Sequence, residues 1–220
     1  MRNLILLAIQ GTGKGTLAQM LKEKYGYVHI STGDILRERV ATGDELGLKI
    51  KELIDNGILV SDDIIFEAVE SRIQQDDCKN GYILDGFPRT LAQAEGYDKI
   101  LEKLGLDKGL ALNLTVSEEV MLHRIATRRT CKSCGKIYNT ENPEMFSKVE
   151  GVCDICNGEI IHRDDDKDPV AVKKRIDTSK ANIQSLLDFY QEKGILHTID
   201  FADRWDGLKE TEKLLGVNVD

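Results

Sequence analysis

The start of the chain contains the feature that most limits how it can fold. Asn3 to Ala8 form a short, unbroken apolar run, and a glycine-rich stretch from Gly11 to Thr16 follows directly. An apolar run of this length is typical of a strand that is buried on both faces of a parallel sheet. Leu17, Met20 and Leu21 then share one helical face, and a glycine ends that helix. The chain therefore begins with a strand, a glycine-rich loop and a helix.

Further short apolar runs, separated by helical patterns, predict the other strands of the sheet. They lie at residues 28–30, 82–84, 110–116 and 196–199. Ser61 and Ser117 are good N-cap residues for two of the intervening helices. Asp168 and Pro169 open a longer helix, which Gly194 closes. Strands that alternate with helices predict an α/β fold with a doubly wound, five-stranded parallel sheet flanked by helices.

Composition restricts the partners of this chain. Its 220 residues, 41% of them hydrophobic, can form one core with inserted modules. A formal net charge of -8 argues against a broad nucleic-acid surface, so phosphate chemistry must come from a few clustered cations. The apolar runs are far shorter than the roughly 20 residues that cross a bilayer, and no signal-cleavage pattern is present. We expect a cytoplasmic protein without a nucleic-acid or membrane partner.

The loop after the first strand is a candidate phosphate-binding loop. Its glycines let backbone N–H groups converge on phosphate oxygens, and the following helix N-terminus favours an anion. Lys14 is placed to reach the terminal phosphates. The strict P-loop pattern is not met, because its first glycine falls at Ala8 and its serine or threonine falls at Gly15. A glycine-rich turn without a ligand is the alternative.

The segment ILDGFPRT, from Ile83 to Thr90, is a second candidate phosphate site. Asp85 ends an apolar strand, where a carboxylate can hold Mg²⁺ through water. Arg89 follows a Phe-Pro turn and can clamp a phosphate with two hydrogen bonds. A helix cap for Asp85 and a surface ion pair for Arg89 are the alternatives. More arginines suit charge neutralisation: Arg124 and Arg128 lie at the entry to the polar region described next, Arg163 lies at its exit, and Arg175 follows on the long helix.

The polar, glycine-rich region from about residue 131 to residue 166 interrupts the strand–helix alternation and predicts an inserted module. It contains two Cys-x-x-Cys pairs separated by 18 residues: Cys131 and Cys134, then Cys153 and Cys156. This spacing is typical of a zinc ribbon with four thiolate ligands, and iron is the other metal that suits sulfur. Gly135 and Gly158 suit the tight turns. A closed four-sulfur site stabilises structure; two redox disulfides are the alternative.

Over essentially its whole length the chain resembles the adenylate kinase family. The resemblance is carried, in order, by GTGKGT (11–16), STGDILR (31–37), ELGLKIKELIDNGILVSD (45–62), NGYILDGFPRTLAQAE (80–95) and RIATRR (124–129). It implies a monomeric enzyme that transfers a phosphoryl group between ATP and AMP, forms ADP, and uses Mg²⁺ with ATP and a structural Zn²⁺. It also implies a core domain (1–30, 61–123 and 167–220), a helical segment that binds the monophosphate (31–60) and a lid over the triphosphate (124–166).

The resemblance implies roles for individual residues. The catalytic set is Lys14, Arg89, Arg128, Arg163 and Arg175. The ATP-binding set is Gly11, Thr12, Gly13, Lys14, Gly15, Thr16, Arg124 and Arg128. The AMP-binding set is Thr32, Arg37, Ile54, Gly86, Arg89, Gln93, Arg163 and Arg175. Asp85 organises Mg²⁺ through water, and the four cysteines of the two pairs hold the zinc.

This chain departs from the family pattern in three places. Ala8 stands where the family has glycine, Gln10 stands where it has proline, and the spacing from Arg163 to Arg175 is one residue longer. Within the class, a kinase for UMP or CMP is the alternative, but Thr32 and Gln93 favour AMP. A GTP donor remains open.

A non-enzymatic nucleotide switch and a zinc-ribbon nucleic-acid binder are alternatives from other classes. A switch needs one nucleotide site, whereas this sequence predicts two. The region between the outer cysteines has only Lys132, Lys136 and Lys148 as cations and no aromatic platform for bases. The switch leaves one of the predicted nucleotide sites unexplained, and the zinc-ribbon nucleic-acid binder leaves both unexplained.

Overall fold

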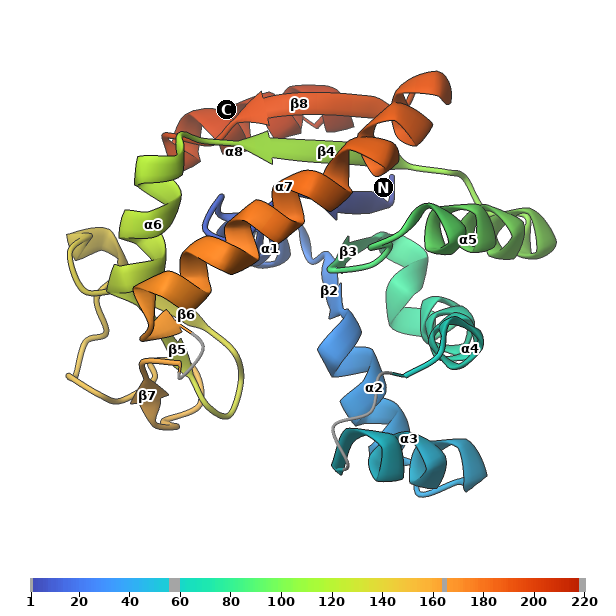
Figure 1. The fold of residues 1–220 in the computed structure, drawn as a ribbon, viewed down its shortest axis with the longest axis horizontal. Coiled ribbons are helices and arrows are strands. Elements are labelled where there is room, and N and C mark those ends of the chain that lie inside the picture. Colours follow the sequence, from blue (N-terminus) through green and yellow to red (C-terminus); the bar gives the residue numbers. More distant parts are fainter. Residues whose placement is uncertain (1, 56–59, 164–165, 218–220) are drawn as a thin grey trace. The chain divides into compact units, whose positions relative to one another are not determined.

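The computed structural model of this chain is an α/β protein in which helices flank a five-stranded sheet (Figure 1). The structure describes residues 2–55, 60–163 and 166–217. Helices separate the strands of the main sheet along the chain, and a second, three-stranded sheet follows the sixth helix. The predicted fold class is confirmed, and so is the interruption of the alternation near the cysteines.

The main sheet has the strand order β2-β3-β1-β4-β8. Its strands are β1 (Leu4–Leu7), β2 (Val28–Ser31), β3 (Tyr82–Asp85), β4 (Leu110–Thr115) and β8 (Leu196–Asp200). Each strand overlaps one of the predicted apolar runs. The central strand β1 pairs in parallel with both β3 and β4, and all four of its residues are buried. This burial on both faces explains why β1 is continuously apolar.

The α-helices include those that the sequence predicts after the glycine-rich loop, after Ser61, after Ser117 and from Pro169. The α-helices are α1 (Lys14–Tyr25), α2 (Thr32–Ala41), α3 (Glu45–Asp55), α4 (Asp62–Ile73), α5 (Leu91–Leu104), α6 (Glu118–Thr127), α7 (Pro169–Glu192) and α8 (Arg204–Leu215). Short 3₁₀ helices span Asp76–Asn80 (η1) and Pro143–Met145 (η2). Ser117 caps α6 by accepting a hydrogen bond from the Val120 N–H. Ser61 is the N-cap of α4, as predicted, but its side chain makes no capping hydrogen bond.

Two apolar clusters hold these elements in place. The larger one joins the sheet to α5 and α7, and the hydroxyls of its buried Tyr82 and Tyr97 lie 2.7 Å apart. The smaller one joins Met121 and Ile125 of α6 to Val172 and Ile176 of α7, and Ile9 packs against it. Ile9 belongs to the loop after β1. The smaller cluster therefore anchors the glycine-rich loop between α6 and α7.

The small sheet has the order β6-β5-β7 and is antiparallel. Its strands are β5 (Arg128–Cys131), β6 (Ile137–Asn139) and β7 (Ile160–Ile161). Tyr138, on β6, is buried beside Cys131 and Cys153. With so few apolar side chains, this module needs a further source of stability.

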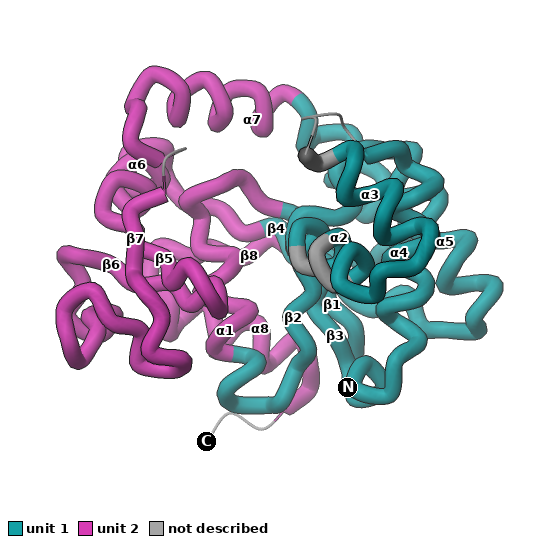
Figure 2. Tube along the Cα trace, turned by 90° about the horizontal axis from the view of Figure 1, so that it is seen from below, with its two compact units in different colours: residues 1–7, 21–113, 182–197 teal, residues 8–20, 114–181, 198–220 magenta. Residues whose placement is uncertain are grey.

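The chain divides into two compact units (Figure 2). One unit comprises residues 1–7, 21–113 and 182–197 and contains β1, β2, β3 and helices α2 to α5. The other comprises residues 8–20, 114–181 and 198–220 and contains the glycine-rich loop, α6, the small sheet and α8. We call the first the AMP-side unit and the second the loop unit, after the residues predicted for each.

Candidate active site

The backbone of the glycine-rich loop requires glycine at two positions. Gly11 has a φ of 86° and Gly13 a φ of 108°, conformations that side-chain-bearing residues rarely adopt. A Cβ on Gly11 would lie 2.7 Å from the Met121 carbonyl oxygen, and one on Gly13 would lie 2.5 Å from the Phe201 ring. Among the described residues other than glycine, Asn157 alone has a positive φ, so Ala8 causes no such backbone strain.

Side chains of the loop stabilise its curvature. The ammonium group of Lys14 donates to the Ala8 carbonyl oxygen at 2.7 Å, and the Thr12 hydroxyl donates to the Ile9 carbonyl oxygen at 2.7 Å. Gly15 follows at the start of α1, and a Cβ there would lie 2.5 Å from Ile137 Cδ1 on β6. Glycine at the position where the strict P-loop pattern has serine or threonine therefore leaves space for the end of the Ile137 side chain.

Arg124 connects the loop to the end of β8. It lies on the last turn of α6, and its guanidinium donates to the carbonyl oxygens of Thr12 at 3.0 Å, Phe201 at 3.0 Å and Ala202 at 2.7 Å. Burial lowers the pKa of Arg124. A fixed cation thus lies directly beside the glycine-rich loop.

Arg128 and Arg175 share an acidic partner. Arg128 Nε and Nη2 donate to the two carboxylate oxygens of Asp166 at 2.9 and 2.8 Å, a bidentate pair. The Asp166 side chain is fully buried, and Arg175 Nη2 lies 3.6 Å from its Oδ1. Arg175 also donates to Gln10 of the loop. The Arg163 carbonyl oxygen accepts a hydrogen bond from the Asp166 N–H at 3.1 Å, while the residue itself is exposed.

A hydrogen-bonded network in the AMP-side unit joins four of the residues predicted for AMP. The Gly86 carbonyl oxygen accepts from the Thr32 hydroxyl at 2.5 Å and from Arg89 Nε at 2.7 Å. Gln93 Oε1 accepts from the Arg89 N–H at 2.8 Å, and Gln93 Nε2 donates to Asp62 Oδ1 at 2.7 Å. Gly86 has a φ of 78°, and the Phe87–Pro88 peptide bond is cis.

Asp85 lies at the end of β3, opposite Ser31 at the end of β2. Its Oδ2 is 3.2 Å from His29 Nε2 on β2. Carboxyl ends of parallel strands are the usual place for ligand-binding side chains in α/β sheets. Asp85 and Ser31 each lie at such an end. The carboxylate is thus oriented by a neighbour on the adjacent strand.

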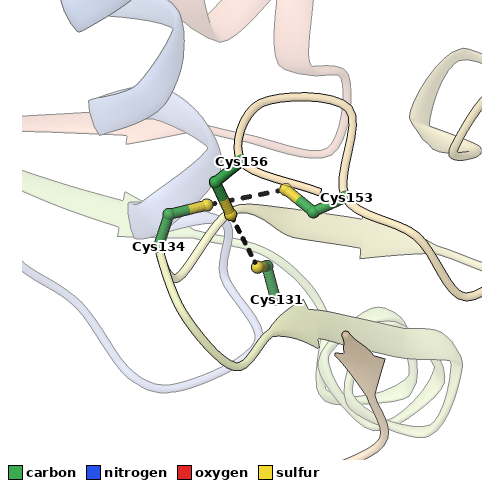
Figure 3. A group of neighbouring side chains, drawn as sticks. All are labelled: Cys131, Cys134, Cys153 and Cys156. Carbon is green, nitrogen blue, oxygen red and sulfur yellow. Dashed lines mark hydrogen bonds between the residues drawn. The ribbon is translucent and has the colours of Figure 1, made fainter. Parts of the chain in front are cut away.

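The four cysteines of the small module converge on one point (Figure 3). All four Sγ atoms lie within 4.8 Å of one another, and Cys131–Cys156 and Cys134–Cys153 are separated by 3.5 and 3.6 Å. Four sulfurs around a tetrahedral Zn²⁺, each about 2.3 Å from the metal, would be about 3.8 Å apart. All five cysteines of the chain are free, which contradicts the disulfide alternative. The tetrad therefore fits a tetrahedral metal ion.

Within the tetrad, the surroundings favour the thiolate form of Cys153, whereas burial raises the pKa of Cys134 to about 12. Burial raises the pKa of Cys153, but hydrogen bonds from the Tyr138 hydroxyl and from backbone N–H groups outweigh it, and the pKa falls to about 6. The Tyr138 hydroxyl donates to Cys153 Sγ at 3.3 Å and accepts from the Asp154 N–H at 2.8 Å. Since metals bind the thiolate form, this arrangement prepares a metal ligand.

The chain is similar to known proteins over nearly all of its length. The family model for adenylate kinase matches residues 6–195. An adenylate kinase of Caldicellulosiruptor saccharolyticus is 48% identical over 215 residues, which cover 97% of this chain and 99% of that protein. The chain belongs to the adenylate kinase family. An adenylate kinase of Archaeoglobus fulgidus is 47% identical over 97% of both chains, and one of Thermodesulfovibrio yellowstonii is 48% identical over 89% of this chain and 90% of its own.

The site residues predicted for this adenylate kinase family member are divided between the two compact units. The loop unit contains residues 11–16, Arg124, Arg128, Arg163, Arg175 and the cysteine tetrad. The AMP-side unit contains Thr32, Asp85, Gly86, Arg89 and Gln93. The side chains of Arg37 and Ile54 lie outside the described part of the structure.

The prediction that Gly158 forms a tight turn of the small module is wrong. In the second cysteine turn the residue with positive φ is Asn157, at 57°, and not Gly158. Gly158 is required for space, because a Cβ there would lie 2.6 Å from Ser133 Oγ and 3.1 Å from Cys131 Sγ. Gly135, with a φ of 73°, does form the tight turn of the first pair.

Some residues beside the family motifs were not found from the sequence. Asp166 binds Arg128, and Phe201 and Ala202 bind Arg124 through their carbonyl oxygens. The run of three aspartates after Arg163 was the available signal for Asp166. Backbone carbonyl oxygens cannot be predicted from side-chain patterns. The position of Phe201 directly after a parallel strand was the available signal, because such strand ends commonly line ligand sites. Across the described residues no helix is long and apolar enough to cross a membrane.

Proposed function

We propose that this chain catalyses the reversible, Mg²⁺-dependent transfer of the γ-phosphoryl group of ATP to AMP, which yields two ADP. As a member of the adenylate kinase family it is a phosphotransferase. A phosphate oxygen of AMP attacks the γ-phosphorus, and the bond to the β–γ bridging oxygen breaks. The observation that supports the proposal is that the residues predicted to bind phosphate form two sets, one in each compact unit of a single family member. A kinase that uses two nucleotides needs both.

The loop unit supplies the donor site in this proposal. Backbone N–H groups of residues 11–16 and Lys14 hold the phosphates of ATP, and Arg124 stacks on its base. Arg128, Arg163 and Arg175 surround the transferred phosphoryl group, where they neutralise charge that spreads over its oxygens. The contact of Arg124 with the loop and the proximity of Arg128, Arg175 and Asp166 support these roles.

The AMP-side unit supplies the acceptor site. Arg37 and Arg89 hold the AMP phosphate, while Thr32, Ile54, Gly86 and Gln93 contact the nucleoside. Arg163 and Arg175 reach the same phosphate during transfer. The hydrogen bonds that join Thr32, Arg89 and Gln93 to one another through Gly86 support this grouping. Such bonds fix side chains before the ligand arrives, which lowers the cost of binding.

Two metal ions complete the proposal. Asp85 orients Mg²⁺ through water, and the ion supplies charge neutralisation on the phosphates. Zn²⁺ is held by Cys131, Cys134, Cys153 and Cys156 and stabilises the lid. The close approach of the four sulfurs supports a metal there, and four thiolates favour zinc over the harder divalent ions.

Closure of two mobile parts protects the reaction from water. In this proposal residues 31–60 close over AMP and residues 124–166 close over ATP, while residues 1–30, 61–123 and 167–220 form the core. Water exclusion favours transfer over hydrolysis. We further propose that the enzyme acts as a cytoplasmic monomer, without nucleic-acid or membrane partners.

A coupled assay of ADP formation tests the proposed function. ATP, Mg²⁺ and either AMP, GMP, CMP or UMP are incubated with the protein, and AMP is expected to give by far the fastest reaction. Lys14→Met is expected to lower the rate with AMP by at least about 100-fold, because the ammonium that neutralises the phosphates is lost. Lys22→Met, at an exposed position of the same helix, is the matched control and should leave the rate unchanged.

Each result of this assay has a distinct meaning. Faster transfer to UMP or CMP would overturn the assignment of AMP and the roles of Thr32 and Gln93. A second series replaces ATP with GTP, and equal rates with the two donors would show that the donor base is not selected. Absence of ADP with every monophosphate would contradict phosphoryl transfer itself.

A further inference from the structure

Gln10 connects the glycine-rich loop to α7 through its side-chain amide. Arg175 donates to Gln10 Oε1 from Nε at 3.0 Å and from Nη2 at 2.7 Å. Gln10 Nε2 donates to the Val172 carbonyl oxygen at 3.4 Å. Val172 and Arg175 lie one turn apart on α7, so the Gln10 amide contacts two successive turns on the same face of this helix.

The chemistry of the partners fixes the orientation of this amide. A guanidinium group can only donate hydrogen bonds, and a carbonyl oxygen can only accept them. Oε1 must therefore face Arg175, and Nε2 must face Val172. Reversing the amide would place N–H groups against N–H groups and lose all three bonds. The side chain of Gln10 is thus held in one orientation by two independent contacts.

We propose that Gln10 is a positioning residue for Arg175 in phosphoryl transfer. The inference rests on the proposed function, in which Arg175 contacts the phosphoryl group that moves. An amide oxygen that accepts from two N–H groups of a guanidinium fixes the plane of that group. Since the amide is neutral, it orients Arg175 without cancelling the positive charge that must meet the phosphate.

A carboxylate near Arg175 makes this orientation necessary. Asp166 Oδ1 lies 3.6 Å from Arg175 Nη2, farther than Gln10 Oε1, and Asp166 already holds Arg128 in a bidentate pair. Without the Gln10 oxygen, attraction to Asp166 would draw the guanidinium away from the loop. Gln10 therefore keeps Arg175 beside the loop, and Asp166 is left to orient Arg128.

A double-mutant cycle between Gln10 and Arg175 tests the inference. Gln10→Leu keeps the approximate size of the side chain and removes its acceptor. It is expected to lower kcat by about 10- to 100-fold, with kcat/KM for ATP falling equally, because misplacing a group that acts in the transition state has this effect. In the Arg175→Ala background the same substitution is expected to change kcat less than about twofold.

The controls separate positioning from a structural role. Gln184→Leu, at an exposed position of α7, should leave kcat and the melting temperature unchanged. If Gln10→Leu does not fold, Gln10→Glu replaces it in the cycle. A carboxylate accepts the same hydrogen bonds but cancels the charge of Arg175, so kcat should fall in the wild-type background and not in the Arg175→Ala background.

Two results would overturn the inference, and a third concerns the enzyme as a whole. Equal losses of kcat in both backgrounds would mean that Gln10 acts independently of Arg175. A fall in melting temperature without a fall in kcat would mean that Gln10 only anchors the loop. A wild-type protein that cannot transfer phosphate between ATP and AMP would instead refute the proposed function, so the two failures are distinguishable.

Discussion

Around the loop that follows β1, glycines provide space and basic side chains provide charge. Gly11, Gly13 and Gly15 each leave a position where a Cβ would collide with α6, Phe201 or the small sheet. Lys14 and Arg124 donate hydrogen bonds to carbonyl oxygens of the same loop. The chain thus closely surrounds this loop.

Gly13→Ala tests the packing of the loop. The new methyl group would lie 2.5 Å from the buried Phe201 ring, and the backbone φ of 108° adds strain. We expect a loss of about 2–4 kcal/mol in the free energy of unfolding. Gly26→Ala is the control: its φ is also positive, at 74°, but a Cβ there meets nothing within 4 Å. Urea unfolding of both variants measures the difference, and equal losses would contradict the role of Phe201.

Tyr138→Phe tests the hydrogen bond to the cysteine tetrad. The substitution removes only the hydroxyl that donates to Cys153 Sγ and accepts from the Asp154 N–H. We expect metal affinity to fall by about 10- to 100-fold, the usual effect of losing such a support. Tyr27→Phe, which removes a buried hydroxyl bonded to the Arg2 carbonyl oxygen, is the control and should not alter it. Competition with a chromogenic chelator provides the measurement; unchanged affinity in Tyr138→Phe would refute the prediction.

At the residue level, the sequence predicts groups that act through their own side chains in a recognisable spacing. The cysteine tetrad is the clearest example, because its spacing alone predicts the convergence of four sulfurs. Gln10 and Asp166 could not be found in this way, since each acts on an arginine that belongs to another element. Their role depends on the tertiary fold, which brings residues distant in the sequence together.

Secondary-structure elements were predictable where apolar periodicity decides which face is buried. The strands and α6 follow such patterns, and Ser117 marks the beginning of α6. Helix α8 was not specified, because its buried face includes Gly207, Thr211 and Glu212 as well as Leu208. When small and polar residues lie on the buried face, apolar residues do not recur at helical spacing, and the helix cannot be predicted from its pattern. Tertiary packing therefore determines α8 more than its own pattern does.

Glu118 links α6 to α7 through Lys173, at 2.6 Å, and Lys180. Hydrogen bonds from these two lysines lower the pKa of Glu118 from 4.5 to about 2. A carboxyl whose pKa is lower in the folded state stabilises the fold above its unfolded pKa, and this stabilisation is lost as the pH falls through the folded pKa. Glu118→Gln should therefore have a lower melting temperature than the wild type at pH 7. This gap in melting temperature should close between about pH 5 and 2.

Thermal melts at a series of pH values measure this effect. Glu119→Gln, at the next and more exposed position of the helix, is the control and should show a smaller gap at pH 7. A gap between wild type and Glu118→Gln that persists unchanged at pH 2 would contradict the assignment of the ion pairs. Because Glu118 is near the surface, high salt should also reduce the gap.

At the scale of the whole molecule, each compact unit contains one of the two proposed nucleotide sites. The loop unit contains the glycine-rich loop with its arginines, and the AMP-side unit contains the network centred on Gly86. Similarity to adenylate kinases extends over nearly the whole chain and includes both sets. The account therefore requires both sets to act in a single reaction.

Removal of the metal tests how much of the molecule depends on the cysteine tetrad. The small sheet contributes few buried apolar residues, so a bound metal should supply much of its stability. Chelation, or Cys153→Ser, is expected to lower the melting temperature by more than about 5 °C and to change turnover at moderate temperature much less. Cys78→Ser is the control for loss of a buried thiol outside the tetrad and should leave metal content unchanged. An unchanged melting temperature after metal removal would refute a structural role.

The most direct test of the account follows the γ-phosphate itself. ATP labelled in its γ-phosphate is mixed with Mg²⁺, AMP and the protein, and the products are separated after a single turnover. The account predicts that the label appears in ADP and that almost none appears as inorganic phosphate. Label released mainly as inorganic phosphate, or at the same rate without AMP, would contradict phosphoryl transfer between two nucleotides as the function of this chain.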